Sequence, residues 1–435
     1  MVSNARVDPG TALIRSNSTR HSLASLSYTG HWAKAEKKLL RKLDWILVPM
    51  LLLTATMGAV DKVAINLGLV GQQYSWAGSI LFIGCIVGMC PSSYLVQRFP
   101  SAKYLSSCSF GWSRMALLIP ACKSWSGLMT IRFLMAVRHI PESAPLAIGN
   151  TCSISAMWSI TMIILLPDSP MNTFFLTAQE RCYAVQRVAQ NKTGIVNKEW
   201  KLDQALEAII DRKTWVLFFF NIAINIPNGG VTTFSGILFK NLGFSAARAS
   251  LLNMPTGFMS TAAAFLFSWI AARWSNRPCL VTMIASCLPI VGSAIVYALP
   301  RTIILGQMAG IYLLYTYFGS YVVGISMAQA NTVGHTKKTV QYSIMYIGYA
   351  VGNLIEPQIF RADQAPAYTG GFIAMTVCYS TCVGLIGISW LLVTRLNRRL
   401  GSVDTEVGAI DGDERAEMVF CDRTDLQQKT FIYIT

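Results

Sequence analysis

Long uncharged apolar stretches alternate with short basic loops along this chain, and this pattern limits its possible folds more than any other feature. A stretch of about 20 apolar residues is long enough to cross a bilayer as a helix. The composition agrees, because a chain of 435 residues with 53% hydrophobic and only 13% charged residues is too apolar for an ordinary water-soluble globule. We therefore expect an all-α polytopic membrane protein.

The stretches with the length of a membrane span lie at 46–67, 76–96, 104–122, 128–150, 214–238, 251–272, 279–299, 303–327, 339–360 and 371–394. A shorter apolar piece occupies 151–166. Lys and Arg gather in loops between alternate stretches, which the positive-inside rule assigns to the cytosol. The stretches after 213 satisfy this rule, whereas those between 46 and 166 are too few for a regular bundle. The expected total is about 10 to 11 spans.

The pattern also divides the chain into segments. These are a cytosolic N-terminal arm at 1–45, an incomplete N-terminal helical bundle at 46–167, a central cytosolic loop at 168–213, a six-helix C-terminal bundle at 214–394 and a cytosolic tail at 395–435. Both termini are expected in the cytosol if the N-terminal bundle crosses the membrane an even number of times.

Several other classes of function find no support in the sequence. The net charge of +15 comes largely from cations beside apolar stretches, so it orients the chain in a bilayer and does not indicate nucleic-acid binding. The cysteines form no CxxC pair and the histidines are scattered, so neither a metal site nor a cofactor is expected. No nucleophile, base and orienting residue are recognisable as a set, so the chain is not expected to be an enzyme. The sequence carries no signal for an oligomeric state.

Short basic turns occupy comparable positions in the two halves of the chain. Arg98 and Lys103 follow the stretch at 76–96, and Arg273 and Arg277 follow the stretch at 251–272. Repeated halves are typical of secondary transporters, whose halves move against each other during transport. The sequence therefore predicts that these turns are conformational-switch loops, although basic inside loops occur in most membrane proteins.

Ionisable residues inside apolar stretches are candidates for function, because a charge in the membrane is costly unless it faces a cavity or a partner. Asp61 and Lys62 are expected to serve coupling and attraction of an anion, or else to reach the membrane interface. Arg132 is a candidate for holding a carboxylate, with a structural anchor as the alternative. Glu142 is a candidate proton carrier, or else a loop residue.

Two apolar stretches carry polar residues near their middle or end. In 214–238, Asn225 and Asn228 lie beside Pro227, which can break a helix and leave polar groups for a solute, or only kink it for packing. In 339–360, a second polar group consists of Asn353, Glu356 and Gln358. Burial would raise the pKa of Glu356 and make it protonatable, unless it leaves the span on the outer side.

Several short motifs together resemble one known family. They lie at 36–66, which contains Asp61 and Lys62, at 73–79 (QYSWAGS), 94–100 (YLVQRFP), 131–134 (IRFL), 166–170 (LPDSP), 227–230 (PNGG), 336–338 (TKK) and 347–360 (IGYAVGNLIEPQIF), and in the tail at Thr424, Asp425 and Phe431. On these motifs the chain resembles the anion:cation symporter family of the major facilitator superfamily, in its fungal allantoate and nicotinate permease branch.

The resemblance implies a major facilitator fold of two helical bundles in the fungal plasma membrane. It also implies a secondary active transporter that couples protons to the uptake of a small organic anion, such as allantoate, nicotinate, pantothenate or a similar carboxylate. The expected partners are therefore that anion, the proton and the lipid bilayer.

The chain departs from the family pattern in two places. Between Arg132 and Pro167 it has about 35 residues where the family has the remainder of one span and two more, so one or two of the family's 12 spans are expected to be missing. Glu356 stands where the family motif has glycine. The alternative to transport is therefore a truncated non-transporting paralogue or an incomplete gene model, with nutrient sensing as one role for such a protein.

Overall fold

The described part of the chain is built from α-helices and contains no β-strand. The computed structural model describes residues 41–42, 45, 73–118, 124–137, 157–162, 173, 176–181, 199–274, 277–300, 302–355, 359, 369–401, 424–427, 431 and 433–435. The expected segment 1–45 therefore lies largely outside the described residues and 46–167 is described only in part, so the domain boundaries stay predictions.

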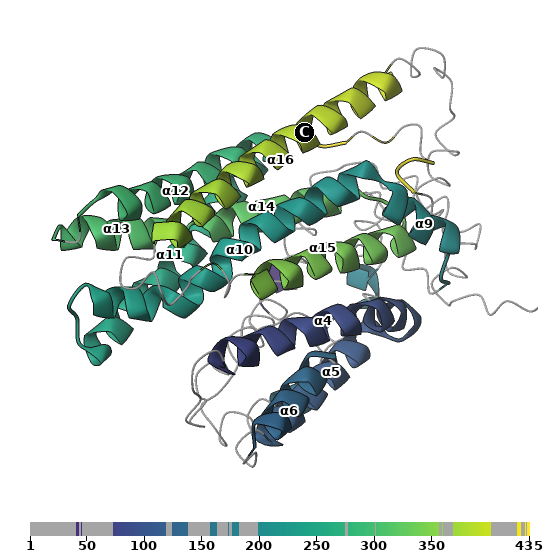
Figure 1. Ribbon diagram of the computed structural model, residues 1–435. Coiled ribbons are helices and arrows are strands. Elements are labelled where there is room, and N and C mark those ends of the chain that lie inside the picture. Colours follow the sequence, from purple (N-terminus) through teal and green to yellow (C-terminus); the bar gives the residue numbers. More distant parts are fainter. Residues whose placement is uncertain are drawn as a thin grey trace, which may run out of the picture.

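The helices fall into two groups with one helix between them (Figure 1). The first group comprises α4 (Gln73–Arg98), α5 (Ser101–Leu118) and α6 (Trp125–Val137). The second comprises α10 (Arg212–Asn241), α11 (Ala246–Arg273), α12 (Pro278–Ala298), α13 (Ile304–Leu314), α14 (Tyr317–Ala330) and α16 (Thr369–Gly401). Between the groups, α15 (His335–Ile355) packs against both α10 and α4. The short α9 (Leu202–Ile210) lies at the end of the molecule where α10 and α15 begin.

Composition and length identify several of these helices as membrane spans. The described residues contain four helices that are long and apolar enough, at Leu251–Arg273, Pro278–Ala298, Ile304–Ala330 and Thr369–Arg398. A fifth is added if the pair Ser79–Met89 and Pro91–Arg98, bent by 51°, is one span. At about 45 Å, α10 is also long enough to cross a bilayer, but it carries polar residues at its centre.

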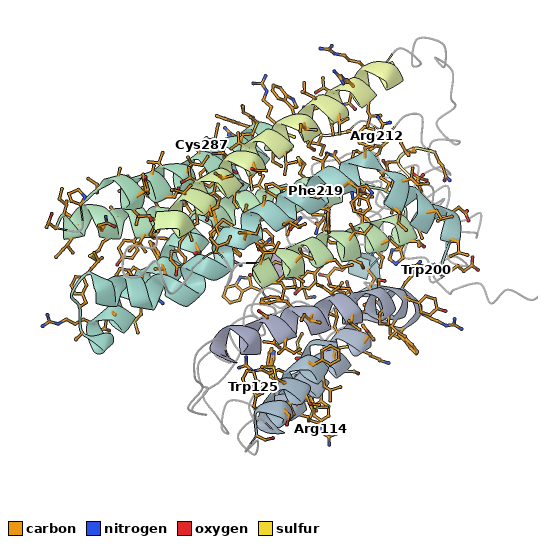
Figure 2. The ribbon with its side chains drawn as sticks, in the orientation of Figure 1. Arg114, Trp125, Trp200, Arg212, Phe219 and Cys287 are labelled. Atoms are coloured by element: carbon orange, nitrogen blue, oxygen red, sulfur yellow. The ribbon has the colours of Figure 1, made fainter. Side chains whose placement is uncertain are left out.

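The outer face of α11 confirms that the second group needs an apolar solvent. Its large apolar side chains are 62% to 74% exposed and recur every three, four or seven positions, at Leu251, Met254, Phe258, Phe265 and Trp269. Such a continuous apolar face is rare on soluble monomers, whereas lipid chains cover it without cost. Cys287 on α12 is exposed on the second group in the same way (Figure 2).

The helices follow the predicted apolar stretches. Of the two alternatives for Pro227, a broken helix is ruled out, because α10 continues as one helix from Arg212 to Asn241 through it. The predicted stretch at 303–327 is confirmed as one span, Ile304–Ala330, within which α13 ends at Leu314 and α14 begins at Tyr317. The interior of the second group is formed by fully buried side chains of α10, α13 and α16, including Phe220, Ile311 and Tyr379.

Candidate functional site

Three asparagines on α10 lie on one face of the helix, directed into the protein. Asn221, Asn225 and Asn228 are four and three positions apart, a spacing that places their side chains on the same side of a helix. Asn221 and Asn225 are each only 1% exposed. Their amide groups are satisfied within the helix, since Asn221 Nδ2 donates to the Leu217 carbonyl and Asn225 Nδ2 to the Asn221 carbonyl.

Asn228 joins this face to two other helices. Its Nδ2 donates to Asn353 Oδ1 on α15 at 3.3 Å and to Asn225 Oδ1 at 3.5 Å. The Tyr317 hydroxyl on α14 donates a short hydrogen bond to Asn228 Oδ1. We name Asn225, Asn228, Tyr317 and Asn353 the asparagine cluster. It brings together three residues that the sequence singled out, and it adds Tyr317, which the sequence did not distinguish from the packing aromatics of its span.

Two glycines allow α15 to approach α10 closely enough for this contact. A Cβ at Gly352 would lie 2.7 Å from the Ile222 carbonyl oxygen and 2.9 Å from Asn225 Cβ. A Cβ at Gly348, one turn earlier, would lie 2.8 Å from the Phe218 carbonyl oxygen. Small residues four apart are the usual means by which helices in membranes approach closely. Asn353 therefore reaches Asn228 because its neighbour has no side chain.

An aromatic group adjoins the asparagine cluster on the side of α4. The ring of Tyr349 stacks on Tyr346 at 5.0 Å between centroids and contacts Tyr321 of α14 at 6.4 Å. Phe82 of α4 meets Tyr349 edge to face at 6.2 Å. Asn353 is linked to this group, because its Nδ2 donates to the Tyr349 carbonyl at 2.8 Å. The polar and aromatic side chains thus meet where the two groups of helices face each other.

The remaining predicted site residues are not part of this cluster. Asp61, Lys62, Glu142, Glu356 and Gln358 lie outside the described residues. Arg132 lies on α6 with its side chain 7% exposed, so this cation is held inside the first group of helices.

The four cations of the predicted switch loops, Arg98, Lys103, Arg273 and Arg277, are exposed at helix ends. The Arg98 guanidinium donates to the Tyr94 hydroxyl at 2.5 Å and lies over the same ring. Their assignment to a conformational switch stays a prediction. The neighbour of Arg98, Gln97, makes a buried contact with Thr336 of α15.

A second polar constellation lies at the end of the molecule where α9, α10 and α15 begin. It consists of Glu207, Asp211, Lys213, Lys337 and Asp425, which we name the tail-side cluster. Lys213 Nζ lies 2.6 Å from Asp425 Oδ2, and Lys337 Nζ lies 2.7 Å from Asp425 Oδ1. Lys337 also contacts Glu207 at 2.8 Å and Asp211 at 3.2 Å. The side chains of Lys337 and Asp425 are both completely buried.

The burial of these charges is matched by their mutual attraction. Burial alone disfavours the charge on Asp425, but attraction and hydrogen bonds from Lys213 and Lys337 hold its pKa below the usual 3.8. Burial likewise disfavours the charge on Lys337, but Asp425, Asp211 and Glu207 keep its pKa above the usual 10.5. Burial and the adjacent Asp425 carboxylate together raise the pKa of Tyr433, whose hydroxyl donates to Asp425 Oδ2 at 2.9 Å.

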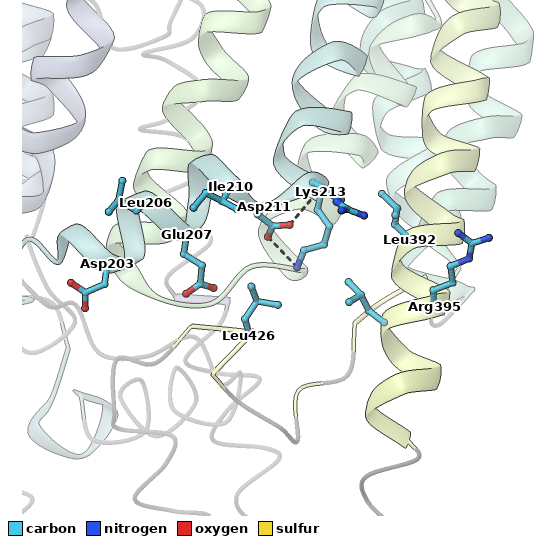
Figure 3. A pocket seen from close by; sticks show the side chains of 11 residues that line it. Asp203, Leu206, Glu207, Ile210, Asp211, Lys213, Leu392, Arg395 and Leu426 are labelled. Atoms are coloured by element: carbon cyan, nitrogen blue, oxygen red, sulfur yellow. Dashed lines mark hydrogen bonds and ion pairs between the residues drawn. The ribbon is translucent and has the colours of Figure 1, made fainter.

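The tail-side cluster borders an open cavity of about 620 Å³ between α9, α10 and α16. Figure 3 shows Glu207, Asp211 and Lys213 beside this cavity, with Leu426 of the tail and Arg395 of α16 also on its wall. Arg212 and Trp200 lie at the same end of the molecule (Figure 2). Among the described residues, no group of His, Cys, Asp or Glu side chains is arranged to hold a metal ion.

Uncharged side chains connect the tail-side cluster to the first group of helices. Gln204 of α9 accepts hydrogen bonds from the backbone N–H groups of Thr336 and Lys337, so it caps the start of α15. Thr336 Oγ1 in turn accepts a hydrogen bond from Gln97 Nε2 of α4 at 2.9 Å, and this contact is buried. Gln97 Nε2 also donates to the Glu199 carbonyl at 3.0 Å.

The sequence contained a partial signal for these residues. Thr336 and Lys337 belong to the motif at 336–338, and Asp425 belongs to the tail motif, but nothing in the sequence paired them. Lys213, Asp211 and Glu207 were assigned to a central loop, where charges are normally solvated. Their burial became visible only with the fold.

Comparison with known proteins shows clear similarity to fungal transporters, although no family model matches the chain. It is 33% identical over 443 residues to the MFS-type transporter cnsL of Penicillium expansum, covering 92% of this chain and 88% of that protein. It is 27% identical to the allantoate permease of Saccharomyces cerevisiae, covering 92% and 86% respectively. The thiamine pathway transporter THI73 of the same yeast is 26% identical, with coverage of 91% and 86%.

Among solved structures, the crystal structure of the E. coli fucose:proton symporter FucP matches with a TM-score of 0.49 and 14% identity. The match covers 73% of this chain and 92% of that one.

Proposed function

The chain belongs to the MFS-type transporters, the major facilitator superfamily, and from this premise we propose that it takes up a small organic anion together with a proton. As a member of this family it is a multi-pass membrane transporter and not an enzyme. The observation that carries the proposal is the asparagine cluster, which joins α10, α14 and α15 beside an aromatic group that faces α4.

The chemistry of the asparagine cluster suits a carboxylate. Amide groups donate hydrogen bonds to carboxylate oxygens, and the rings of Tyr349 and Phe82 offer flat apolar surfaces to a heterocycle. The two bonds that Asn228 Nδ2 donates are long, at 3.3 and 3.5 Å, and therefore weak. A bound anion can replace them at small cost, whereas the shorter bonds that Asn221 and Asn225 donate to carbonyls of α10 stay in place.

The relatives and the site together support this substrate class. One relative is named an allantoate permease, and the family branch that the motifs resemble implies nicotinate and pantothenate as well. We propose a carboxylate of this size, bound near the middle of the membrane and exposed alternately to each side as the two helix groups move. Proton coupling rests on the family resemblance, with Asp61, Glu142 and Glu356 as candidate carriers and Lys62, Arg132 and Gln358 as candidate contacts to the anion.

We further propose the fungal plasma membrane as the site of action, with the tail-side cluster on the cytosolic side. The basic residues near the helix ends there, Arg212, Lys338 and Arg395, agree with this orientation.

Uptake of labelled allantoate, nicotinate and pantothenate, in yeast without its own permeases for them, tests the proposal. We expect uptake of at least one compound, faster at about pH 5 than at about pH 7, because a proton gradient drives a coupled symporter. Asn228→Ala should reduce uptake about tenfold or more, since it removes the amide that connects three helices. Thr261→Ala is the control, because Thr261 is exposed on α11 and its hydroxyl donates to the Gly257 carbonyl of the same helix.

Uptake of none of the three anions at either pH, with the protein present at the cell surface, would contradict this proposal and favour a non-transporting paralogue. If the Asn228 and Thr261 variants lost uptake equally, the asparagine cluster would not be part of the substrate site.

A further inference from the structure

The last described residues of the chain dock onto the ends of several helices. The tail segment, defined as 424–427, 431 and 433–435, contacts α16 through Asn397, whose Oδ1 accepts the Tyr433 N–H at 2.9 Å. Beyond α14, Asn331 Oδ1 accepts the Ile434 N–H at 2.7 Å. Phe431 and Tyr433 pack with Val333 and Val393 in a small apolar cluster. The tail segment is thus held by specific bonds and by buried apolar surface.

Asp425 makes the strongest contacts of the tail segment. One carboxylate oxygen accepts from Lys337 of α15, and the other accepts from Lys213 of α10 and from the Tyr433 hydroxyl. Both lysine contacts are shorter than 2.8 Å, as expected for charge-assisted hydrogen bonds. Asp211 also lies near both lysines, but at 3.5 and 3.2 Å. Asp425 is therefore the closer link between the two helices.

The two helices linked by Asp425 are the ones that carry the asparagine cluster. Along α10, Lys213 and Asn228 are separated by about 22 Å, and along α15, Lys337 and Asn353 are separated by about 24 Å. The same helix pair is thus joined at one end by a carboxylate of the tail and again by two amides, near the middle of α10 and the far end of α15. A helix pair joined at two levels tilts as one body.

We propose that the tail segment is an intramolecular clamp and that Asp425 is a positioning residue for transport, because it holds the ends of α10 and α15 together. This inference uses the proposed function for its transport consequence, whereas docking of the tail segment stands on contacts alone. The Gln97–Thr336 bond lies next to the clamped end of α15, so the clamp also holds the surface that α4 contacts.

Asp425→Asn in the full-length protein tests the docking with little change in volume. An amide has one acceptor oxygen and one NH2 donor, so it can serve only one lysine and turns a donor toward the other. Hydrogen–deuterium exchange of the detergent-purified protein should then show amides of 433–434 exchanging about tenfold faster or more. The amides at the start of α15, at 335–341, should also exchange faster.

The matched control is Asp203→Asn, which makes the same chemical change on the exposed face of α9. Exchange in α12 serves as the internal reference for an intact fold. If the Asp425 and Asp203 variants exchange alike at 433–434, or if these amides are already unprotected in the unchanged protein, the clamp does not exist.

A substitution on α10, which the tail segment contacts, distinguishes loss of the clamp from an effect confined to the tail segment. Lys213→Met leaves the tail sequence intact and removes one of the two cations, so it should also speed exchange at 433–434, 220 positions away along the chain. Protection at wild-type level in this variant would show that apolar packing of Phe431 and Tyr433 holds the tail, and would overturn the role of Asp425.

The uptake rate per transporter at the cell surface supplies the readout that a merely stabilising residue would not move, because lower stability changes only the amount of protein. We expect Asp425→Asn to lower this maximal rate several-fold while KM stays within about twofold, because the clamp acts on helix movement and not on contacts with the anion. An increase of KM at unchanged maximal rate would overturn the positioning role. If the unchanged protein transports none of the tested anions, the exchange results still decide whether the clamp exists.

Discussion

Asn228 combines two properties that matter for a binding site within a membrane. It is bonded to three other side chains on three helices, yet two of its bonds are long enough to be exchanged for a ligand. A polar group in lipid must find partners inside the protein, and here the partners are other uncharged groups. The cluster is therefore stable without a ligand and still able to accept one.

The buried charges of the tail-side cluster make a prediction about pH. Because the pKa of Asp425 is lowered by folding, its contribution to the free energy of unfolding is complete above about pH 4 and is lost as pH falls through the folded pKa. The high pKa of Lys337 means that its contribution is complete below about pH 10 and is lost as pH rises through its folded value. Between these limits the contribution of the cluster is constant.

We therefore expect the difference in thermal midpoint between the unchanged protein and its Asp425→Asn variant to be flat from about pH 5 to about pH 9. Thermal unfolding of the purified proteins across this range measures it. Taking the difference cancels the titration of the histidines and other groups that are present in both proteins. A step in this difference near neutral pH would show that the carboxylate of Asp425 is not paired with the two lysines as described.

At the scale of helices, the contact of α10 with α15 depends on the absence of a side chain at Gly352. A methyl group there would lie 2.7 Å from a backbone oxygen that cannot move aside alone, so α15 must shift outward. We expect Gly352→Ala to cost about 1–3 kcal/mol of stability and to reduce uptake. The reduction follows because the same shift draws Asn353 away from Asn228. Thermal unfolding and uptake, measured together, check both effects.

Gly384 on α16 provides the control for this substitution, because a Cβ there has nothing within 4 Å. Gly384→Ala should be neutral or stabilising by up to about 1 kcal/mol, as alanine is the better helix former. If both alanine variants behave alike, helix propensity and not close packing determines the outcome, and the glycine contact does not position Asn353.

How far the sequence predicts these features differs between helices and contacts. Apolar stretches predicted α11, α12 and α16 closely, because membrane length and hydrophobicity act on each helix separately. Asn225 and Asn228 were singled out because they lie beside Pro227 in an apolar stretch, and Asn353 because it belongs to a second polar group. Tyr317 was not singled out, because aromatic residues in membrane helices usually serve packing.

The tail-side cluster lay beyond sequence reasoning for a different reason. Asp425 is 212 positions from Lys213 and 88 from Lys337, and no local pattern encodes such pairings. Charges outside apolar stretches are normally solvated, so their burial could not be inferred from neighbours in sequence. The sequence also left open whether Pro227 breaks or only kinks its helix, because a proline removes one helix hydrogen bond and local sequence does not show whether the others persist; in the structure α10 continues through it.

On the scale of the whole molecule, movement between the two helix groups must disturb the contact between α4 and α15. Thr336 lies at this contact, where its Oγ1 accepts the buried hydrogen bond from Gln97. Thr336→Val keeps the shape of the side chain but cannot accept, so Gln97 loses its bond to α15 while its bond to the Glu199 carbonyl stays, and the Lys201 N–H loses its bond to Thr336 Oγ1. We expect exchange at 94–98 of α4 and at 335–341 of α15 to rise together, by roughly fivefold to tenfold for a bond worth about 1–1.5 kcal/mol.

Thr339→Val is the control for the Thr336→Val exchange experiment. The Thr339 hydroxyl lies one turn further along α15 and donates to the His335 carbonyl of the same helix at 2.9 Å. The two variants therefore remove the same group from the same helix, and only one removes a link to α4. Faster exchange on α4 with Thr336→Val alone would mean that this bond restrains the helix groups against each other. Faster exchange on α15 with no change on α4 would mean that the groups are held by their apolar contacts, such as Phe82 on Tyr349, and that Thr336 matters only to its own helix.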